Sequence, residues 1–218
     1  MKIGGVYLAA GKSMRMGKQK LALPIHNTTI GSMALREVVQ SSLTTIYVIT
    51  NGNHTWVDQD LLINKKCMFI ECPTAARGQA ESLKWGVKHA NIAKMDAIIV
   101  LLADQPFISK KLIEQLITCF KNETSLDFVA SSTAGITMPP ILFSATMFPR
   151  IKTLEGDKGA KAFLKNKAFH GKRLIIENTR LFYDVDTEED YRNLLFYANK
   201  SFEKDLNHCY GGKMKTFK

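Results

Sequence analysis

The sequence contains no apolar run that approaches the roughly 20 consecutive residues that a helix needs to cross a bilayer. The N-terminus also lacks a secretory pattern, because the apolar run after Lys2 ends almost at once in Ala9-Ala10-Gly11. The four cysteines form no CxxC pair, and no His/Cys cluster has the spacing of a zinc site. These absences argue against a membrane protein, a secreted precursor and a zinc protein, and they favour a reducing, cytoplasmic compartment.

Two common nucleotide-binding fingerprints are absent as well. Gly11-Lys12-Ser13 resembles the end of a P-loop, but a P-loop requires a glycine at the position that Val6 occupies here. The sequence also contains no GxGxxG fingerprint for a dinucleotide. Any nucleotide site in this chain must therefore use a motif other than these two.

The charge balance is strongly basic, with a net charge of +10 and a local excess of lysine from Lys200 to Lys218. Such a balance indicates anionic partners, either nucleic acid or phosphate-rich small molecules. No aromatic-interleaved motif of the kind found in RNA-binding domains appears. Small phosphorylated ligands therefore explain the charge better than nucleic acid does.

The 218 residues, 45% of them hydrophobic, suffice for one domain with a sizeable core. Apolar runs of strand length alternate with helical patterns, and Ala97–Leu102 is apolar throughout, as in a strand buried on both faces. We expect an α/β fold with a mainly parallel sheet and helices on both faces. The predicted strands of the first half are Ile3–Leu8, Ile46–Thr50, Met68–Glu71 and Ala97–Leu102, and the predicted helices cover Ala80–Ala90 and Leu112–Phe120.

The second half is less regular. Three short strands are predicted among prolines and loops, where antiparallel additions to a sheet are common, and they cover Phe128–Ser131, Pro140–Phe143 and Leu174–Ile176. A further helix is expected near Ala160–Lys165. Residues 1–199 are predicted to form the domain, and residues 200–218 a basic C-terminal tail with little order.

The segment from Leu8 to Leu21 is the richest in chemistry, and it directly follows a predicted buried strand. Ligands of open α/β sheets bind at the carboxyl ends of strands. The small residues at positions 9 to 11 let the backbone approach a ligand closely, and successive N–H groups there can form an anion nest. Arg15 and Lys20 add positive charge, which suits a triphosphate. The alternative is an ordinary strand-to-helix turn with surface cations.

Asp104 directly follows the predicted strand Ala97–Leu102, which places its carboxylate at the same edge of the sheet. One hard carboxylate oxygen, together with substrate phosphates and water, is what Mg²⁺ prefers. The alternative is that Asp104 caps the following helix, but Ser109 lies nearer the expected helix start and is the better cap.

A second acidic segment precedes the last predicted helix. Thr187 and Asp190 have the spacing of a capping box that opens a helix, which accounts for both without any function. Asp184 and Asp186 are not explained in this way. Residues two apart in extended chain point to the same side, and two such carboxylates repel unless a cation lies near them.

Two weaker segments carry candidate ligand contacts. Gly78 and Ser82 stand at the start of a predicted helix, where glycine and serine are common for structural reasons alone. Lys158 and Lys161 stand in a glycine-containing loop and could meet a phosphate, although a solvated turn is an equally good account.

Taken in order, these segments resemble a known family. Leu8-Ala9-Ala10-Gly11-x-Ser13-x-Arg15-Met16-Gly17-x-x-Lys20-Leu21 resembles the signature of the MobA-like nucleotidyltransferases. Its Ala-Ala-Gly form and the string Ala103-Asp104-Gln105-Pro106-Phe107 resemble the cytidylyltransferase branch that acts on the molybdenum cofactor. The segment from Asp184 resembles the family's Asp-x-Asp-Thr-Pro-Glu-Asp motif, with Glu188 in place of proline. The resemblance covers Ile3 to about Leu195 and implies a GT-A-like, Rossmann-like nucleotidyltransferase fold.

The resemblance also implies roles for individual residues. Lys20, Arg15 and Asp104 would be catalytic, and Mg²⁺ would bind Asp104 and Asp186, with Asp184 as a neighbour. The acceptor would meet Lys158 and Lys161. The nucleotide would contact Leu8, Ala9, Ala10, Gly11, Ser13, Gly17, Gly78 and Ser82.

The implied reaction transfers a nucleoside monophosphate from an NTP, with CTP favoured, to molybdopterin or molybdenum cofactor, and releases pyrophosphate. An apo-molybdoenzyme is a candidate partner. The alternatives are a sugar- or polyol-phosphate cytidylyltransferase, a non-catalytic cofactor-binding chaperone and a nucleic-acid-binding module. One departure concerns the acceptor side, where the family usually has a Gly-x-Pro pattern and this sequence reads Ile136-Thr137-Met138-Pro139-Pro140-Ile141-Leu142-Phe143.

Overall fold

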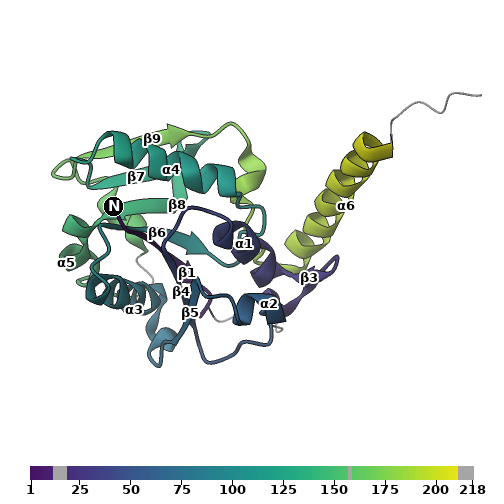
Figure 1. Ribbon diagram of the computed structural model, residues 1–218, viewed down its shortest axis with the longest axis horizontal. Helices are drawn as coiled ribbons and strands as arrows, with labels where there is room; N and C mark the ends of the chain where they lie inside the picture. Colours follow the sequence, from purple (N-terminus) through teal and green to yellow (C-terminus); the bar gives the residue numbers. More distant parts are fainter. Residues whose placement is uncertain (12–18, 157–158, 211–218) are drawn as a thin grey trace, which may run out of the picture.

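The computed structural model describes residues 1–11, 19–156 and 159–210 (Figure 1). Its main sheet has seven strands in the order β5-β4-β1-β6-β8-β7-β9, and a separate two-stranded hairpin pairs β2 with β3. The strands are β1 (Ile3–Leu8), β2 (Pro24–Ile25), β3 (Thr28–Thr29), β4 (Thr45–Thr50), β5 (Cys67–Glu71), β6 (Ala97–Leu102), β7 (Phe128–Thr133), β8 (Ile136–Ser144) and β9 (Gly171–Ile175).

The main sheet is mostly parallel, as the sequence predicts. The four strands β5, β4, β1 and β6 run side by side in one direction. Only β8 among the strands of this sheet runs against its neighbours β6 and β7, while β9 pairs with β7 in parallel. The expectation of antiparallel additions is therefore right for β8, which pairs in antiparallel fashion with both β6 and β7, and wrong for β9. Ala134 and Gly135 join β7 to β8, and both have positive φ, which is the conformation of a tight hairpin turn.

Helices cover both faces of the sheet, which confirms the predicted fold class (Figure 1). The α-helices are α1 (Ile30–Val39), α2 (Gln59–Leu62), α3 (Gln79–Ile92), α4 (Lys110–Asn122), α5 (Phe148–Ile151) and α6 (Glu188–Tyr210). Short 3-10 turns are η1 (Lys20–Ala22), η2 (Ala75–Arg77), η3 (Ala145–Met147), η4 (Ala160–Phe163) and η5 (Thr179–Phe182). The helix expected near Ala160–Lys165 is thus the single turn η4, flanked by Gly159.

Two hydrophobic clusters lie on opposite faces of the sheet because side chains alternate along each strand. In β6, Ile99 and Leu101 pack in the cluster with α1 and α4, whereas Ile98 and Val100 pack in the cluster with α3 and α5. All four of these side chains are at most 3% exposed, so β6 is buried on both faces as predicted.

Helix α3 lies unusually close to β1. A Cβ atom at Gly86 would overlap the side chain of Val6, so only glycine permits this approach. Because α3 follows β5 and returns across the sheet to β6, its N-terminus lies at the carboxyl edge of the strands. Gly86 therefore helps to set where the start of α3 meets that edge.

Helix α6 leaves the body of the molecule at one side (Figure 1). Leu194 and Ala198 are buried, and the Tyr191 hydroxyl donates to the Pro24 carbonyl at 2.7 Å. The helix continues across residue 200, where the sequence predicts a tail with little order. Within the described part of the chain, no helix combines the length and apolar character of a membrane span.

Candidate active site

The candidate site begins where β1 and β6 end side by side, since Leu8 pairs with Leu102. Just beyond these ends the Ala103 N–H donates to the Leu8 carbonyl at 3.1 Å, and the Ala9 N–H donates to the Ile49 carbonyl at 2.8 Å. Ala9 and Ala10 are buried, but Gly11 is exposed and a Cβ there would meet no described atom within 4 Å. The predicted nucleotide loop therefore leaves the sheet at the edge where α/β folds bind ligands.

The chain from residue 12 to residue 18 lies outside the described residues, and so does Lys158. The predictions for Ser13, Arg15, Gly17 and Lys158 therefore remain predictions. Description resumes at Gln19, whose side-chain oxygen accepts a hydrogen bond from Thr55 Oγ1 at 3.0 Å, directly before Lys20.

Three predicted residues meet at the centre of the site. Lys20 Nζ donates to Asp104 Oδ2 at 2.7 Å and to Asp186 Oδ1 at 2.8 Å, although these residues lie 84 and 166 positions away in the sequence. The Lys20 side chain is only 12% exposed, against 25% for Asp104 and 46% for Asp186. The fold thus brings the predicted catalytic lysine and both predicted metal ligands into direct contact.

The two carboxylates stabilise the positive charge of the Lys20 ammonium. Burial alone would lower the pKa of Lys20, but Asp104 and Asp186 together raise it above its usual value. Lys20 is therefore a fixed positive charge at neutral pH, at the point where a triphosphate would enter.

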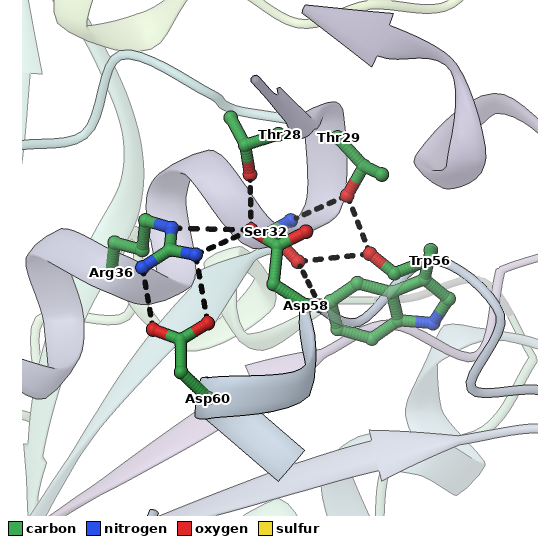
Figure 2. A network of polar contacts seen from close by, with 7 residues as sticks. All are labelled: Thr28, Thr29, Ser32, Arg36, Trp56, Asp58 and Asp60. Carbon is green, nitrogen blue, oxygen red and sulfur yellow. Dashed lines mark hydrogen bonds and ion pairs between the residues drawn. The ribbon is translucent and has the colours of Figure 1, made fainter.

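The loop that contacts Gln19 is held by a polar network (Figure 2). Asp58 accepts hydrogen bonds from Arg36 Nη2 at 2.7 Å and from Thr28 Oγ1 at 2.5 Å. The Trp56 carbonyl accepts from Ser32 Oγ at 2.8 Å, and its ring packs so closely on α1 that a Cβ at Gly31 would overlap it. Trp56 is 1% exposed, so it is a packing residue and not a ligand platform.

Asp186 is held by the cap of the following helix. Asp190 Oδ2 accepts from the backbone N–H groups of Asp186 at 3.1 Å and Thr187 at 2.8 Å, while the Asp190 N–H donates to Thr187 Oγ1. The preceding Val185 is fully buried and its N–H donates to the Asp104 carbonyl at 3.1 Å. The predicted capping box therefore exists, and it orients the residue that contacts Lys20.

Asp184 has a different environment from Asp186. Its carboxyl forms a hydrogen bond with Gln105, and burial together with the nearby Asp104 raises its pKa above the usual value. Because Asp184 also presents surface to water, solvent screens much of this effect.

No function was predicted for Gln105 from the sequence. It is 1% exposed, and its Oε1 atom has no hydrogen-bond partner in the described structure, which is unusual for a buried polar atom. The only sequence signal for it is its position directly after Asp104 in the string shared with the cytidylyltransferase branch.

The residues of the two weaker candidate segments also lie close together. Gly78 has a φ of 123°, a conformation that favours glycine, and Ser82 in the same helix start is buried. The Ala80 N–H donates to the Gly156 carbonyl at 3.0 Å, so the loop carrying Lys161 lies against the start of α3. A cavity of about 230 Å³ lies here and is lined by Leu8, Gln79, Leu83, Val100, Leu102, Pro139, Ile141, Gly159 and Lys161.

The donor set at the centre fits a magnesium–nucleotide complex better than a protein cage. Mg²⁺ is usually held by one or two carboxylates together with substrate phosphates. Asp104 and Asp186 supply two such carboxylates from the ends of different elements. No group of three or more His, Cys, Asp or Glu side chains suited to a metal occurs in the described ranges.

Comparison with known proteins gives a consistent assignment. The model of the MobA-like NTP transferase domain matches residues 5–173, more than half of the chain. The purine catabolism protein PucB of Bacillus subtilis (strain 168) is 37% identical over 194 residues, which cover 86% of this chain and 93% of that protein. The probable molybdenum cofactor guanylyltransferase of Mycobacterium avium (strain 104) is 26% identical over 200 residues, which cover 89% of this chain and 95% of that protein.

A solved structure supports the same fold. The manganese complex of Rv0371C from Mycobacterium tuberculosis H37Rv has a TM-score of 0.71 at 23% identity, and the match covers 89% of this chain and 98% of that one. This likeness agrees with the α/β fold described above. The chain belongs to the family of MobA-like NTP transferase domains and is a nucleotidyltransferase.

Proposed function

We propose that this protein is a magnesium-dependent cytidylyltransferase that transfers CMP from CTP to a phosphorylated acceptor, molybdopterin or molybdenum cofactor, and releases pyrophosphate. The observation that carries the proposal is the contact of Lys20 with Asp104 and Asp186 at the carboxyl edge of β1 and β6. A lysine and two carboxylates at that edge form a suitable site for a metal-chelated triphosphate.

The proposed reaction is an in-line displacement at the α-phosphorus. A phosphate oxygen of the acceptor attacks, a new P–O bond forms, and the bond between the α-phosphorus and the bridging oxygen of pyrophosphate breaks. Mg²⁺ on Asp104 and Asp186 would neutralise charge on the phosphate oxygens. Lys20, with Arg15, would stabilise charge that develops on the α-phosphate and the leaving pyrophosphate. The acceptor phosphate is already ionised, so the chain needs no general base.

The same proposal assigns the binding residues. Backbone groups of Leu8, Ala9, Ala10 and Gly11, with Ser13 and Gly17, would hold the nucleotide, and Gly78 and Ser82 would read the base. Lys161, with Lys158, would bind the acceptor phosphate, since Lys161 lines the cavity beside the start of α3. An apo-molybdoenzyme would receive the product, and the cysteine usage favours the cytoplasm as the site of this reaction.

The choice of CTP and of the acceptor has two kinds of support. The Ala-Ala-Gly form of the nucleotide loop resembles the cytidylyltransferase branch, and one relative is named as a probable molybdenum cofactor guanylyltransferase. A pyrophosphate-release assay with each of the four NTPs and with molybdenum cofactor, sugar phosphates and polyol phosphates decides between the candidates. Turnover with CTP and molybdenum cofactor is expected. Turnover with GTP alone or with a sugar phosphate alone would replace the assignment, and cofactor binding without turnover would support the chaperone instead.

A substitution of Asp104 tests the site itself. Asp104→Ala removes one of the two proposed metal ligands, so we expect pyrophosphate release to fall by at least about 100-fold, as for other groups that stabilise a transition state. Asp60→Ala is the matched control, because this exposed carboxylate pairs with Arg36 away from the site. Circular dichroism should show the same fold in both variants. Near-normal turnover of Asp104→Ala would contradict the metal assignment.

A further inference from the structure

Lys20 stands where a divalent metal would have to bind. Its Nζ atom lies within 2.8 Å of one oxygen from each of the two carboxylates that the proposed function assigns to Mg²⁺. The side chain is only 12% exposed, so the ammonium is held against these oxygens and is largely shielded from water.

Mg²⁺ and the Lys20 ammonium cannot both bind the Asp104 and Asp186 oxygens without weakening each other's binding. Mg²⁺ requires oxygen ligands at about 2.0 to 2.1 Å in near-ideal octahedral geometry. A metal bound to both Asp104 and Asp186 would lie beside the ammonium that donates to the same carboxylates, and the two positive charges would repel. The metal must therefore displace Lys20 from at least one carboxylate, or bind more weakly.

The rest of the site would favour a metal once Lys20 has moved. Asp184 lies close enough to Asp104 for their charges to interact, and the charge of Lys161 also acts on Asp184. The carboxylate of Asp184 adds to the negative potential that a divalent ion would meet at Asp104, and Lys161 offsets part of it.

We propose that Lys20 acts as an internal cation that holds the two carboxylates in place of the metal while no nucleotide is bound. The triphosphate then draws the ammonium away, so the metal and the nucleotide bind together and each promotes binding of the other. In this role Lys20 is a positioning residue and determines the order of binding, in addition to its contact with the α-phosphate. The inference rests on the proposed function, because it requires a metal at Asp104 and Asp186.

Binding of manganese tests the proposal without turnover. Free Mn²⁺ gives a paramagnetic resonance signal that is lost on binding, so its Kd can be measured with and without a non-hydrolysable CTP analogue. In the wild type, Mn²⁺ alone should bind weakly and the analogue should strengthen its binding. In Lys20→Met, Mn²⁺ alone should bind at least about tenfold more tightly than in the wild type, within the usual range of coupling between sites.

Controls separate this inference from the function on which it rests. Lys20→Gln keeps a polar but neutral side chain and should behave like Lys20→Met, so a packing defect in one variant does not decide the outcome. Lys172→Met, on the exposed edge of the sheet, removes the same charge elsewhere and should bind Mn²⁺ like the wild type. Adding Asp104→Asn to Lys20→Met should abolish the gain.

Two results would overturn the proposal in different ways. Equal binding of Mn²⁺ alone by the wild type, Lys20→Met and Lys20→Gln would show that Lys20 does not compete with the metal, while the proposed function would stand. If Mn²⁺ binds none of these proteins in a way that depends on Asp104, with or without the analogue, the metal assignment and this inference both fail.

Discussion

At the residue scale, Gln105 has opposite effects on the stability of the fold and on the candidate site. A buried polar atom without a partner costs about 1–3 kcal/mol, and Gln105 Oε1 is such an atom in the described structure. The Gln105 side chain also forms a hydrogen bond with Asp184. This bond favours the ionised form of the Asp184 carboxyl, which lies near Asp104. The residue therefore contributes little to folding while it shapes the charge of the site.

Replacing Gln105 by leucine, which has a similar volume, should separate its effect on stability from its effect on turnover. The free energy of unfolding should stay within about 1 kcal/mol of the wild type or rise, because the unsatisfied oxygen is removed. Pyrophosphate release should fall by about tenfold, as expected for a residue that supports a functional group from behind.

Urea unfolding and the pH dependence of turnover measure the two effects. Without Gln105 the pKa of Asp184 should rise further, so the acidic limb of the rate profile should move to higher pH. A large loss of stability with an unchanged pH profile would show that Gln105 is a packing residue.

The residues at the centre of the site could be predicted from the sequence, and Gln105 could not. Lys20 and Asp104 follow predicted strands, and Asp186 is left over once the capping box explains its neighbours. Asp104 comes directly after a strand, at the edge where ligands of parallel sheets bind, whereas the roles of Lys20 and Asp186 were implied by the family resemblance. Gln105 differs because its distinguishing property, a buried atom without a partner, depends on packing that no local pattern encodes.

At the element scale, the cap of α6 connects helix stability to the site. Burial alone would raise the pKa of Asp190, but hydrogen bonds from Thr187 and from the N–H groups of Asp186 and Thr187 together lower it. A carboxyl whose pKa is lowered in the folded state stabilises the fold above its unfolded pKa, near 3.9 for aspartate. That stabilisation disappears as the pH falls through the lower folded pKa.

Asp190→Ala should therefore destabilise the protein by about 1 kcal/mol at pH 7, the usual cost of a lost helix cap. The difference from the wild type should vanish as the pH falls below about 4. Glu189→Ala is the matched control, because Glu189 is the exposed neighbour in the same helical turn. Urea unfolding from pH 3 to pH 7 measures the difference, and a gap between the variants that is independent of pH would contradict this role of the carboxylate.

Element starts were predicted more reliably than strand directions. Ser109 caps α4 as expected, since the Leu112 N–H donates to its Oγ at 3.3 Å, and this signal is local. The parallel pairing of β9 with β7 was not predicted, because strand direction is fixed by contacts between residues more than 40 positions apart. The turn at Ala134-Gly135, by contrast, explains why β8 alone reverses.

At the scale of the whole molecule, the site depends on elements from both faces of the sheet. Lys20 enters on the side of α1, while Gly78 and Lys161 belong to the side of α3. Gly86 and Gly31 each allow a close approach, of α3 to β1 and of Trp56 to α1. The sequence predicted residues that the fold brings together, such as Lys20, Asp104 and Asp186, but these close approaches depend on the shape of packed side chains and could not be predicted.

Helix α6 raises the question of where the functional unit ends. Its attachments to the body involve Tyr191, Leu194 and Ala198, and the Tyr197 ring packs edge-on against Tyr183. These described contacts come from residues before 200, and the helix itself continues to Tyr210. A protein that ends at residue 199 would keep every one of them.

Deletion of residues 200–218 should consequently leave the enzyme folded and active. The deleted segment contains five lysines and only two acidic residues, so the remaining protein should also elute from a heparin column at lower salt. We expect a thermal midpoint within about 2 °C of the wild type, because a loss of only a few tenths of a kcal/mol shifts the midpoint by that amount at this size. Deletion from residue 191 onward is the informative contrast, since it removes the buried Leu194 and Ala198 and should lower the midpoint clearly. If the shorter deletion abolished nucleotide turnover without changing the thermal midpoint, the basic segment would be part of the catalytic unit. Its positive charge would then act on the substrates themselves and not only on unrelated anions.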